Sequence, residues 1–200
     1  MAARLTVLPP ERFTALRPSI EAQTQTLASM IVDEKFADFF DPSLRAMLVE
    51  SFRQMGADEG TIWLLDEDRQ HLVPRYNSGP NANTFVGTFR QSLREGMISM
   101  VVATEQPICE NEMPKNRRQD RRLDEQLQLQ TVAMLAVPFY FAREMRGVIS
   151  CVQLQPAGST TVRSGFSHEH LQALQLSAGV LSRLIDYRLL SLCLGLEGLG

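Results

Sequence analysis

The stretch MLAVPFYFAREMRGVISCVQL, residues 134–154, decides the fold of this chain. Two apolar runs flank a short turn that contains Arg143, Glu144 and Arg146, and this pattern predicts an antiparallel hairpin. Successive side chains of a strand face opposite sides of the sheet. The two sets in the first run are Leu135, Val137, Phe139 and Phe141 on one face and Met134, Ala136 and Tyr140 on the other. A hairpin with one face in water would alternate apolar and polar residues, so we expect both faces of this sheet to be covered.

The composition of the 200-residue chain is typical of a globular domain, with 44% hydrophobic and 22% charged residues. A formal net charge of -3 and an isoelectric point near 5.7 give no field that would attract nucleic acid or an anionic membrane. The sequence has no apolar run of signal-peptide length before Pro9, and no run of the roughly 18 apolar residues that span a bilayer. We therefore expect a cytoplasmic protein with no membrane partner and no direct nucleic-acid partner.

The sequence contains no arrangement of residues that indicates catalysis or metal binding. Cys109, Cys151 and Cys193 are far apart and form no CxxC pair, which favours reduced thiols over a disulfide framework or a zinc site. His168 and His170 lie two positions apart on a predicted helix, about 200° from each other, so they cannot share a metal. No GxSxG stretch and no phosphate-binding glycine loop is present. We expect a protein that is not an enzyme, and the sequence leaves any cofactor unknown.

Capping signals and apolar spacing mark two helices before the first strand. Apolar residues at near-helical spacing predict a helix over residues 11–32, with a break near Pro18 because proline removes a helical hydrogen bond. A second helix begins after Asp41, which can accept from free backbone amides, and Pro42 suits its first turn. Gly56 ends this helix, since glycine readily adopts the left-handed conformation of helix termini.

Short strands and one small helix are predicted between these helices and the hairpin. Strands are expected over residues 61–66 and 71–76, the second at an edge or bulged because Pro74 cannot donate to a ladder. A short strand, a turn at Gly96, a small helix to Ala103 and a strand near Ile108 follow. Residues 113–131, here called the lid, are polar and contain four arginines, Arg117, Arg118, Arg121 and Arg122. These arginines form either a solvated surface or a site for a phosphate or carboxylate group.

A long helix is predicted near the end of the sequence. Ser167 is a good N-cap, and Phe166 with Leu171 matches a hydrophobic staple, so we expect a helix that runs to about Leu190. Its two apolar stripes are Leu171, Leu174, Ala178, Leu181 and Ile185, and Leu176, Val180, Leu184 and Tyr187. One stripe can pack on the sheet while the other meets a partner helix, which predicts a homodimer. The alternative is a helix buried within one chain.

The order helix, helix, hairpin, small helix, lid, hairpin and long helix resembles a GAF domain, the small-molecule sensor module of signalling proteins. Four segments carry the resemblance, TIWLLDEDRQHLV, GMISMVVATEQPICENE, MLAVPFYFAREMRGVISCVQL and FSHEHLQALQLSAGVLSRLI. It covers about residues 24–190, with residues 1–23 as an N-terminal extension or helix and 191–200 as a tail or truncated connecting helix. The resemblance implies an α+β fold with a central antiparallel sheet of five to six strands. The N- and C-terminal helices would cover one face, and the short helix and the lid would cover a pocket on the other.

The resemblance, together with strand alternation, implies a set of ligand-binding residues. These residues are Gly96, Met97, Ser99, Met100, Glu110, Asn111, Thr131, Met134 and Tyr140. Free backbone amides after Gly96 would favour an anionic or polar ligand group. The sequence does not fix the strand register, and a shift of one residue would turn strand candidates to the other face.

The ligand signatures of well-known GAF domains do not carry over to this chain. Gln155 and Pro156 replace the Asn-Lys pair of members that bind cyclic nucleotides, and His170 with Leu171 replaces their acidic pair. Cys109 does not stand beside a histidine, as the linking cysteine of bilin-binding members does. The resemblance therefore implies a sensor whose ligand the sequence does not name.

Three functions follow from these observations. The first is a non-enzymatic regulatory domain that binds a small metabolite and passes its occupancy through the terminal helices to an effector protein. The second is a dimerisation or interaction module whose pocket is filled by its own side chains, for which methionine side chains are well suited. The third is a thiol-based redox enzyme that uses Cys109 and resembles free methionine sulfoxide reductase.

Overall fold

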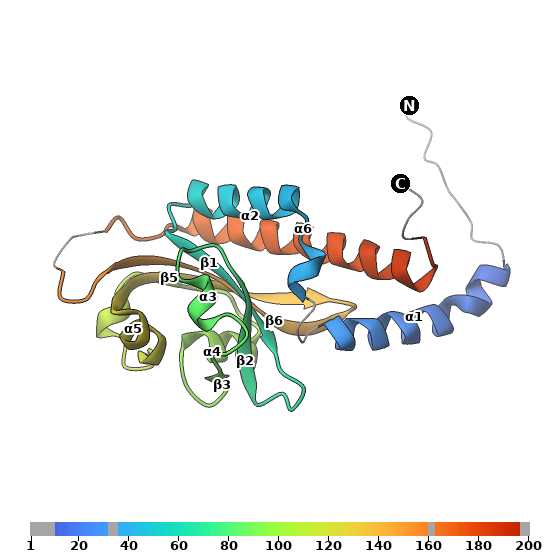
Figure 1. Ribbon diagram of the computed structural model, residues 1–200, viewed down its shortest axis with the longest axis horizontal. Helices are drawn as coiled ribbons and strands as arrows, with labels where there is room; N and C mark the ends of the chain where they lie inside the picture. The colour runs from blue at the N-terminus through green and yellow to red at the C-terminus, as the bar shows by residue number, and fades with distance from the viewer. Residues whose placement is uncertain (1–10, 32–35, 160–162, 197–200) are drawn as a thin grey trace.

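The computed structural model describes residues 11–31, 36–159 and 163–196. A six-stranded antiparallel sheet with the order β3-β2-β1-β6-β5-β4 lies between two layers of helices (Figure 1). The strands are β1 Glu59–Leu65, β2 His71–Asn77, β3 Gln91–Ser92, β4 Ile108–Glu110, β5 Leu129–Phe141 and β6 Glu144–Pro156. The α+β class and the antiparallel sheet that the sequence predicts are confirmed.

The longer helices cover one face of the sheet and the short helices cover the other (Figure 1). The first layer consists of α1 Glu11–Ile31, the 3₁₀ helix η1 Phe36–Phe39, α2 Pro42–Gln54 and α6 His168–Cys193. The second layer consists of α3 Ala82–Phe85, α4 Met97–Thr104, the 3₁₀ helix η2 Met113–Lys115 and α5 Arg122–Leu127. This is the predicted placement of the terminal helices, the small helix and the lid. Among the described residues, no helix has the length and apolar character needed to cross a lipid bilayer.

The β5–β6 hairpin is covered on both faces, as its apolar pattern predicts. On one face, Phe139 and Phe141 belong to a buried cluster that includes Leu174 and Leu181 of α6. On the other face, Ala136 belongs to a second buried cluster that includes residues of α4. Alternate side chains of one strand therefore hold the two helix layers on opposite sides of the sheet.

Bulges change the side-chain alternation in two strands. The pairing of β5 with β6 skips Val132, so Thr131 and Met134 can face the same layer although they are three positions apart. In β2, the pairing with β1 skips Arg75, next to Pro74. The bulge or edge position that Pro74 predicts is therefore confirmed.

The predicted helix ends are confirmed at α2 and at the start of α6. Asp41 Oδ1 accepts a hydrogen bond from Leu44 N at 2.9 Å, and Gly56 follows α2 with a φ of +71°. Ser167 Oγ accepts from His170 N at 3.3 Å, and His170 Nδ1 accepts from Ser167 N at 3.2 Å. His170 thus takes the place of the glutamate in a capping box.

The helices differ from the predictions in three respects. The predicted break near Pro18 is wrong, because α1 runs unbroken across it. Residues 14–19 are exposed, so water can donate a hydrogen bond to the carbonyl group that Pro18 leaves without a partner in the helix. The last helix continues beyond Leu190 to Cys193, and the short helices α3 and α5 lie in segments for which no helix was predicted. Val32, residues 1–10 of the extension and residues 197–200 of the tail lie outside the described residues. α1 crosses the predicted boundary between residues 23 and 24, and that division stays a prediction.

The tip of the β5–β6 hairpin is fixed between α1 and α6. Ala142 and Arg143 have φ values of +49° and +61°, which suit a two-residue hairpin turn. Ala142 N donates to Asp186 Oδ1 at 2.6 Å, and Ala142 O accepts from Gln25 Nε2. Arg143 forms an ion pair with Glu21 at 2.8 Å. The hairpin therefore contacts both terminal helices through its turn.

Candidate ligand-binding site

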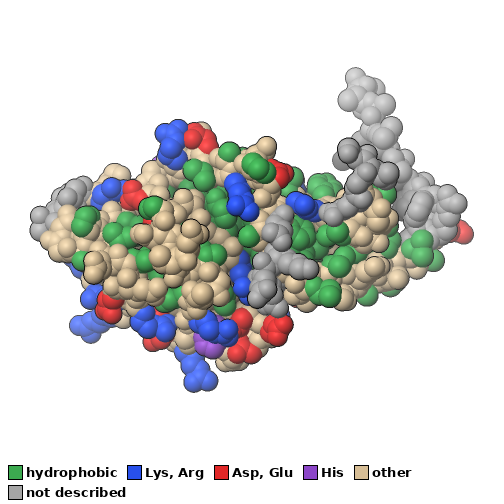
Figure 2. Space-filling model, viewed as in Figure 1, with side chains coloured by type: hydrophobic (Ala, Val, Ile, Leu, Met, Phe, Trp, Pro, Cys, Tyr) green, Lys and Arg blue, Asp and Glu red, His purple; other side chains and the backbone are tan. Residues whose placement is uncertain are grey.

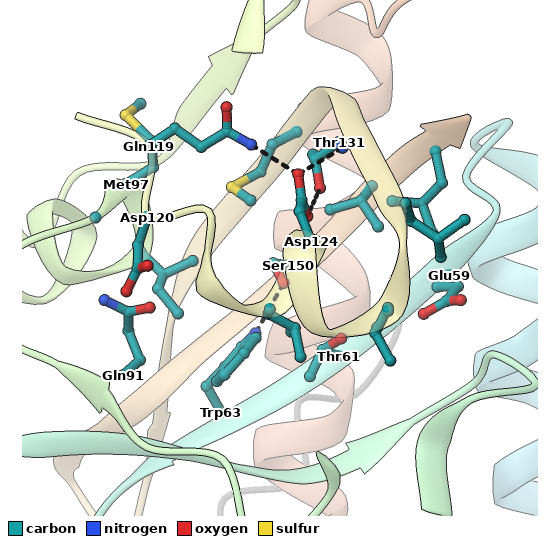
Figure 3. Close-up of a pocket in the computed structure, with 18 of the residues that line it drawn as sticks. Glu59, Thr61, Trp63, Gln91, Met97, Gln119, Asp120, Asp124, Thr131 and Ser150 are labelled. Carbon is teal, nitrogen blue, oxygen red and sulfur yellow. Dashed lines mark hydrogen bonds between the residues drawn. The ribbon is translucent and has the colours of Figure 1, made fainter. Parts of the chain in front are cut away.

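A cavity of about 80 Å³ lies between the sheet and the second helix layer. The sheet contributes lining residues from all of its strands except β4, and the helices α3, α4, η2 and α5 with the loops next to them contribute the rest (Figure 3). The volume exceeds the ~10–15 Å³ that one water molecule needs, so the cavity can hold a small molecule. Apolar and aromatic side chains predominate in the lining, and several polar groups lie among them. This composition is typical of ligand-binding sites.

Three side chains of β1 and β6 are fixed in the floor of the cavity. Thr61 and Ser150 are partners across the β1–β6 pairing. The indole Nε1 of Trp63 donates to Ser150 Oγ at 2.9 Å. The buried indole N–H therefore has a partner, and the ring is held in one orientation against the cavity.

Glu59 brings a carboxylate to the same floor, although its side chain is only 5% exposed. Asn77 Nδ2 donates to Glu59 Oε2 at 3.0 Å and to Thr61 Oγ1 at 2.9 Å. Burial raises the pKa of Glu59, the hydrogen bond from Asn77 opposes this rise, and the nearby Asp58 carboxylate adds to it. The cavity therefore contains a buried acidic group whose hydrogen-bond donor, among the described residues, is a neutral amide.

Asp124 of α5 forms hydrogen bonds with the start of β5, and these bonds hold the lid over the cavity. Its Oδ2 accepts hydrogen bonds from Thr131 N at 2.8 Å and from Gln119 Nε2 at 2.9 Å. Its Oδ1 accepts from Thr131 Oγ1 at 2.7 Å, and Figure 3 shows these donors converging on the carboxylate. Burial raises the pKa of Asp124, although the hydrogen bonds oppose this rise.

The start of α4 forms a further part of the wall. Gly96 has a φ of +91°, and a Cβ atom at this position would lie 2.8 Å from Gln91 Nε2, so only glycine fits without a shift. Gln91 Nε2 donates to Glu95 O at 2.9 Å and thereby fixes the turn before α4. Asp120 lies on the same side of the cavity, paired with Arg122 at 2.6 Å. Burial alone would raise the pKa of Asp120, but the hydrogen bonds and the charge of Arg122, with a hydrogen bond from Gln91, together lower it.

The structure places four of the nine predicted ligand-binding residues at the cavity. These four are Gly96, Met97, Thr131 and Met134. The two from β5 reach it together because of the bulge at Val132. Direct contact between these residues and a ligand stays a prediction.

Three more of the nine lie outside the cavity around α4. Ser99 is buried and donates to Ser92 O at 2.7 Å, which joins α4 to β3. Met100 and Glu110 line a separate surface groove together with Arg117. In this groove the Glu110 carboxylate accepts from two nearby groups of the chain, so its hydrogen bonds stabilise the start of the lid.

Asn111 and Tyr140, the last two of the nine, also lie away from the cavity. Asn111 Nδ2 donates to Phe166 O at 2.9 Å, and Asn111 Oδ1 accepts from Phe166 N at 2.7 Å. This pair of bonds positions the chain before α6. Tyr140 Oη donates to Glu105 Oε2 at 2.6 Å at the end of α4, and burial and Glu105 together raise the pKa of Tyr140 to about 12. A ligand role for these two residues stays a prediction.

Several polar residues of the cavity were not identified from the sequence. In β1, Glu59, Thr61 and Trp63 alternate with apolar residues, and this alternation is the signal that places them on one face. Asp124 gave no such signal, because α5 has only six residues and its approach to Thr131 is a tertiary contact.

The remaining reactive side chains lie outside the cavity. Asp66, Asp68 and His71 lie close together at the β1–β2 turn, where Arg90 pairs with Asp66 and already supplies a positive charge. Burial raises the pKa of the Cys109 thiol and the adjacent Glu110 adds to the rise, which disfavours the thiolate form that a redox enzyme needs. The described lining of the cavity contains no cysteine.

The family model of the GAF domain matches residues 44–186. The chain belongs to the GAF domain family. GAF domains are sensory domains of signalling proteins, and they generally act as regulatory modules. The matched residues include the whole described cavity lining and most of α6. Comparison with curated proteins gives no match.

Solved GAF structures have a similar fold. The GAF domain of an Acinetobacter phosphoenolpyruvate-protein phosphotransferase is 22% identical, with a TM-score of 0.58 over 94% of this chain and 99% of that chain. The corresponding domain from Coxiella burnetii is 19% identical, with a TM-score of 0.59 over 88% of this chain and 95% of that chain. Residues 122 to 287 of a methyl-accepting chemotaxis protein are 18% identical, with a TM-score of 0.57 over 90% and 99% of the two chains. At these identities the likeness establishes the fold alone.

Proposed function

We propose that this chain is a non-enzymatic regulatory GAF domain that binds a small metabolite in the cavity and transmits its occupancy through α1 and α6. The observation that carries this proposal is the lidded cavity itself, where buried polar groups of the sheet face a helix held by Asp124. Oriented polar groups in an apolar cavity are suited to recognising one ligand. The raised pKa of Cys109 argues against a thiol enzyme. A cytoplasmic location and the absence of direct nucleic-acid binding are part of the proposal.

The β5–β6 hairpin supplies the path from the cavity to the terminal helices. Thr131 and Met134 of β5 line the cavity, and the same strand ends at the turn where Ala142 contacts α6 through Asp186 and α1 through Gln25. A ligand that holds the lid closed favours one arrangement of this hairpin over others. The shift in population is limited by the difference in ligand affinity between the two arrangements.

An exposed apolar row on α6 supports a homodimer. The row consists of Leu176, Val180, Leu184 and Tyr187, with Leu176 71% and Tyr187 68% exposed. Figure 2 shows many hydrophobic side chains over the region where α1 and α6 extend beyond the sheet. Pairing of this row with a second copy would remove it from water and connect the two cavities through the same helices. An effector protein that contacts the paired helices would then respond to whether the cavity holds a ligand.

The second candidate function is an interaction module whose pocket needs no ligand. Met97, Met113 and Met134 line the cavity and favour this alternative, because flexible thioether side chains adapt well to fill space. Under this alternative the exposed α6 row still mediates association, and no metabolite raises the melting temperature.

A thermal-shift screen separates the two functions. Nucleotides, amino acids, amines and organic acids are tested against the purified chain, and a ligand at 100 times its Kd adds about 2.7 kcal/mol of stability. For a chain of this size the melting temperature should rise by roughly 5–10 °C. Met134→Trp should abolish the rise by filling the cavity, whereas Met100→Trp, in the surface groove, should retain it. A folded Met134→Trp variant with unchanged ligand affinity would exclude this cavity as the site.

A further inference from the structure

The charged side chains that line the cavity are all acidic within the described residues. They are Glu59, Asp120 and Asp124. Asp120 is already paired with Arg122, and Asp124 accepts three hydrogen bonds from the lid and β5. For Glu59, the donor found in the described part of the chain is the neutral side chain of Asn77. The charge of Glu59 is therefore available for a ligand to neutralise.

Aromatic rings line the same cavity as these acidic groups. Trp63, Phe85 and Phe89 line the same cavity, and the rings of Trp63 and Phe89 meet edge to face with their centroids 6.2 Å apart. The face of an aromatic ring attracts a cation. Phe89 already accepts one within this protein, because Arg122 Cζ lies 5.5 Å from the centroid of its ring. The lining thus offers a carboxylate for an ammonium group and aromatic rings for the carbon chain of a ligand.

An acidic side chain of the protein lies near the amino end of α4, where the free amides predict an anionic or polar ligand group. The Cβ atom of Asp120 lies 3.5 Å from the position that a Cβ atom at Gly96 would take. An acidic side chain of the protein therefore already stands beside the free amides of this helix. A phosphate or carboxylate ligand would approach three protein carboxylates in a cavity of low polarity, where like charges repel strongly.

We infer that the cavity binds a small organic cation, a protonated amine whose ammonium group is held by Glu59 and whose carbon chain lies against Trp63 and Met134. The inference rests on the proposed function, since a cavity filled by the chain's own side chains would bind no amine. The small volume limits the ligand to a short chain, and the position of Glu59 at the start of β1 places the charge at one side of the cavity.

A series of probes of equal length tests the sign of the charge. Butylamine, butan-1-ol and butyrate carry the same carbon chain with a positive, neutral or negative end group. Binding is measured by isothermal titration calorimetry and by ligand-observed NMR on the wild-type chain at neutral pH. The expected order of affinity is butylamine, then butan-1-ol, then butyrate, with at least a tenfold step of about 1.4 kcal/mol between the amine and the alcohol.

A matched pair of variants tests the role of Glu59. Glu59→Gln keeps the shape of the side chain and removes its charge, and it should lower the affinity for butylamine about tenfold or more while butan-1-ol binding stays unchanged. Glu125→Gln removes an exposed acid from α5 and should leave both affinities unchanged. If both variants weaken butylamine binding equally, general attraction by the acidic surface explains the effect and the inference is wrong.

Two further results overturn the inference, and they differ in what they mean for the proposed function. Tighter binding of butyrate than of butylamine, lost in Met134→Trp, would make the cavity an anion site and would leave the sensor function intact. No binding of any probe, together with a flat metabolite screen, would reject both the amine ligand and the sensor function. The wild-type series needs no variant, so the test stands even where Glu59→Gln does not fold.

Discussion

The lid over the cavity depends on one carboxylate, and Asp124→Ala should release it. The substitution removes the acceptor of three hydrogen bonds, from Thr131 N, Thr131 Oγ1 and Gln119 Nε2. A hydrogen bond to a charged group contributes ~1.5–3 kcal/mol, which gives an upper bound of roughly 4.5–9 kcal/mol for the three. Two effects reduce this bound. Burial of the carboxylate itself carries a cost, as the raised pKa of Asp124 indicates, and the half-exposed Gln119 regains bonds to water.

We therefore expect Asp124→Ala to lower the free energy of opening of α5 by about 2–4 kcal/mol. The opening is local, because α5 contributes no buried side chain to either core cluster. Hydrogen exchange measures it directly, since the amide of Thr131 is one of the three donors. At ~1.4 kcal/mol per factor of ten, this amide should exchange about 30-fold to 700-fold faster.

Two comparisons decide whether the effect arises at the lid. Amides of α6 around Leu181 should exchange at the wild-type rate, because that helix packs on the opposite face of the sheet. Glu125→Ala changes the exposed neighbour of Asp124 on the same helix and should leave the Thr131 amide protected. If Thr131 exchanges at the same rate in folded Asp124→Ala and in wild type, the three hydrogen bonds do not hold the lid.

Three further predictions concern the sheet, the buried acid and the α6 row. Gly147→Ala should destabilise the chain by about 4 kcal/mol or more in urea unfolding, because the added Cβ would lie 1.8 Å from a carbonyl oxygen of β1. Gly179→Ala is the control, because Gly179 has open space around it, and this substitution should stabilise α6 by ~0.5–1 kcal/mol. Burial raises the pKa of Glu59, so the stability that its protonated form contributes is complete below its ordinary value near 4.5 and is lost as pH rises through the raised pKa. Glu59→Gln should therefore gain stability relative to wild type as pH rises from about 4.5 through the raised pKa, and a difference in unfolding free energy that does not change with pH would contradict this. Leu184→Glu should convert a dimer to a monomer in size-exclusion chromatography with light scattering, whereas Gln175→Glu, also exposed on α6, should not.

The sequence predicts this fold well where its signals are local. The hairpin of residues 134–154 is apolar on both sides, and the structure places the two sides in separate core clusters. Asp41 and Ser167 act as caps, because a short polar side chain before an apolar stripe satisfies free amides within its own turn. The predicted helix break at Pro18 is wrong because the cost of the missing hydrogen bond depends on whether water reaches the helix at that point. The local sequence pattern does not show this.

The cavity is harder to predict because its residues meet through tertiary contacts. Alternation assigns both Thr131 and Met134 to the cavity face of β5 only when the bulge at Val132 is known. No residue type in that segment indicates a bulge. The resemblance and strand alternation make Asn111 a pocket candidate, and in the structure its side chain bonds the backbone of Phe166. Polar side chains in a sequence therefore indicate that a hydrogen bond is made, and the fold decides with which partner.

One buried charged residue lies at each end of the proposed signalling path, which runs from the cavity to the terminal helices. Glu59 lies at the cavity, and Arg146, 8% exposed, lies at the other end of the hairpin, where its Nη2 donates to Gln25 Oε1 at 2.5 Å. Burial lowers the pKa of Arg146, and its Nε has no hydrogen-bond partner in the described part of the chain. Apolar side chains of similar size would fill both positions at a lower cost in desolvation. Arg146 offsets this cost by holding α1 against the hairpin and by pairing with Glu144 at 3.0 Å, whereas stability alone does not favour the Glu59 carboxylate, which suits the ligand-binding role proposed for it.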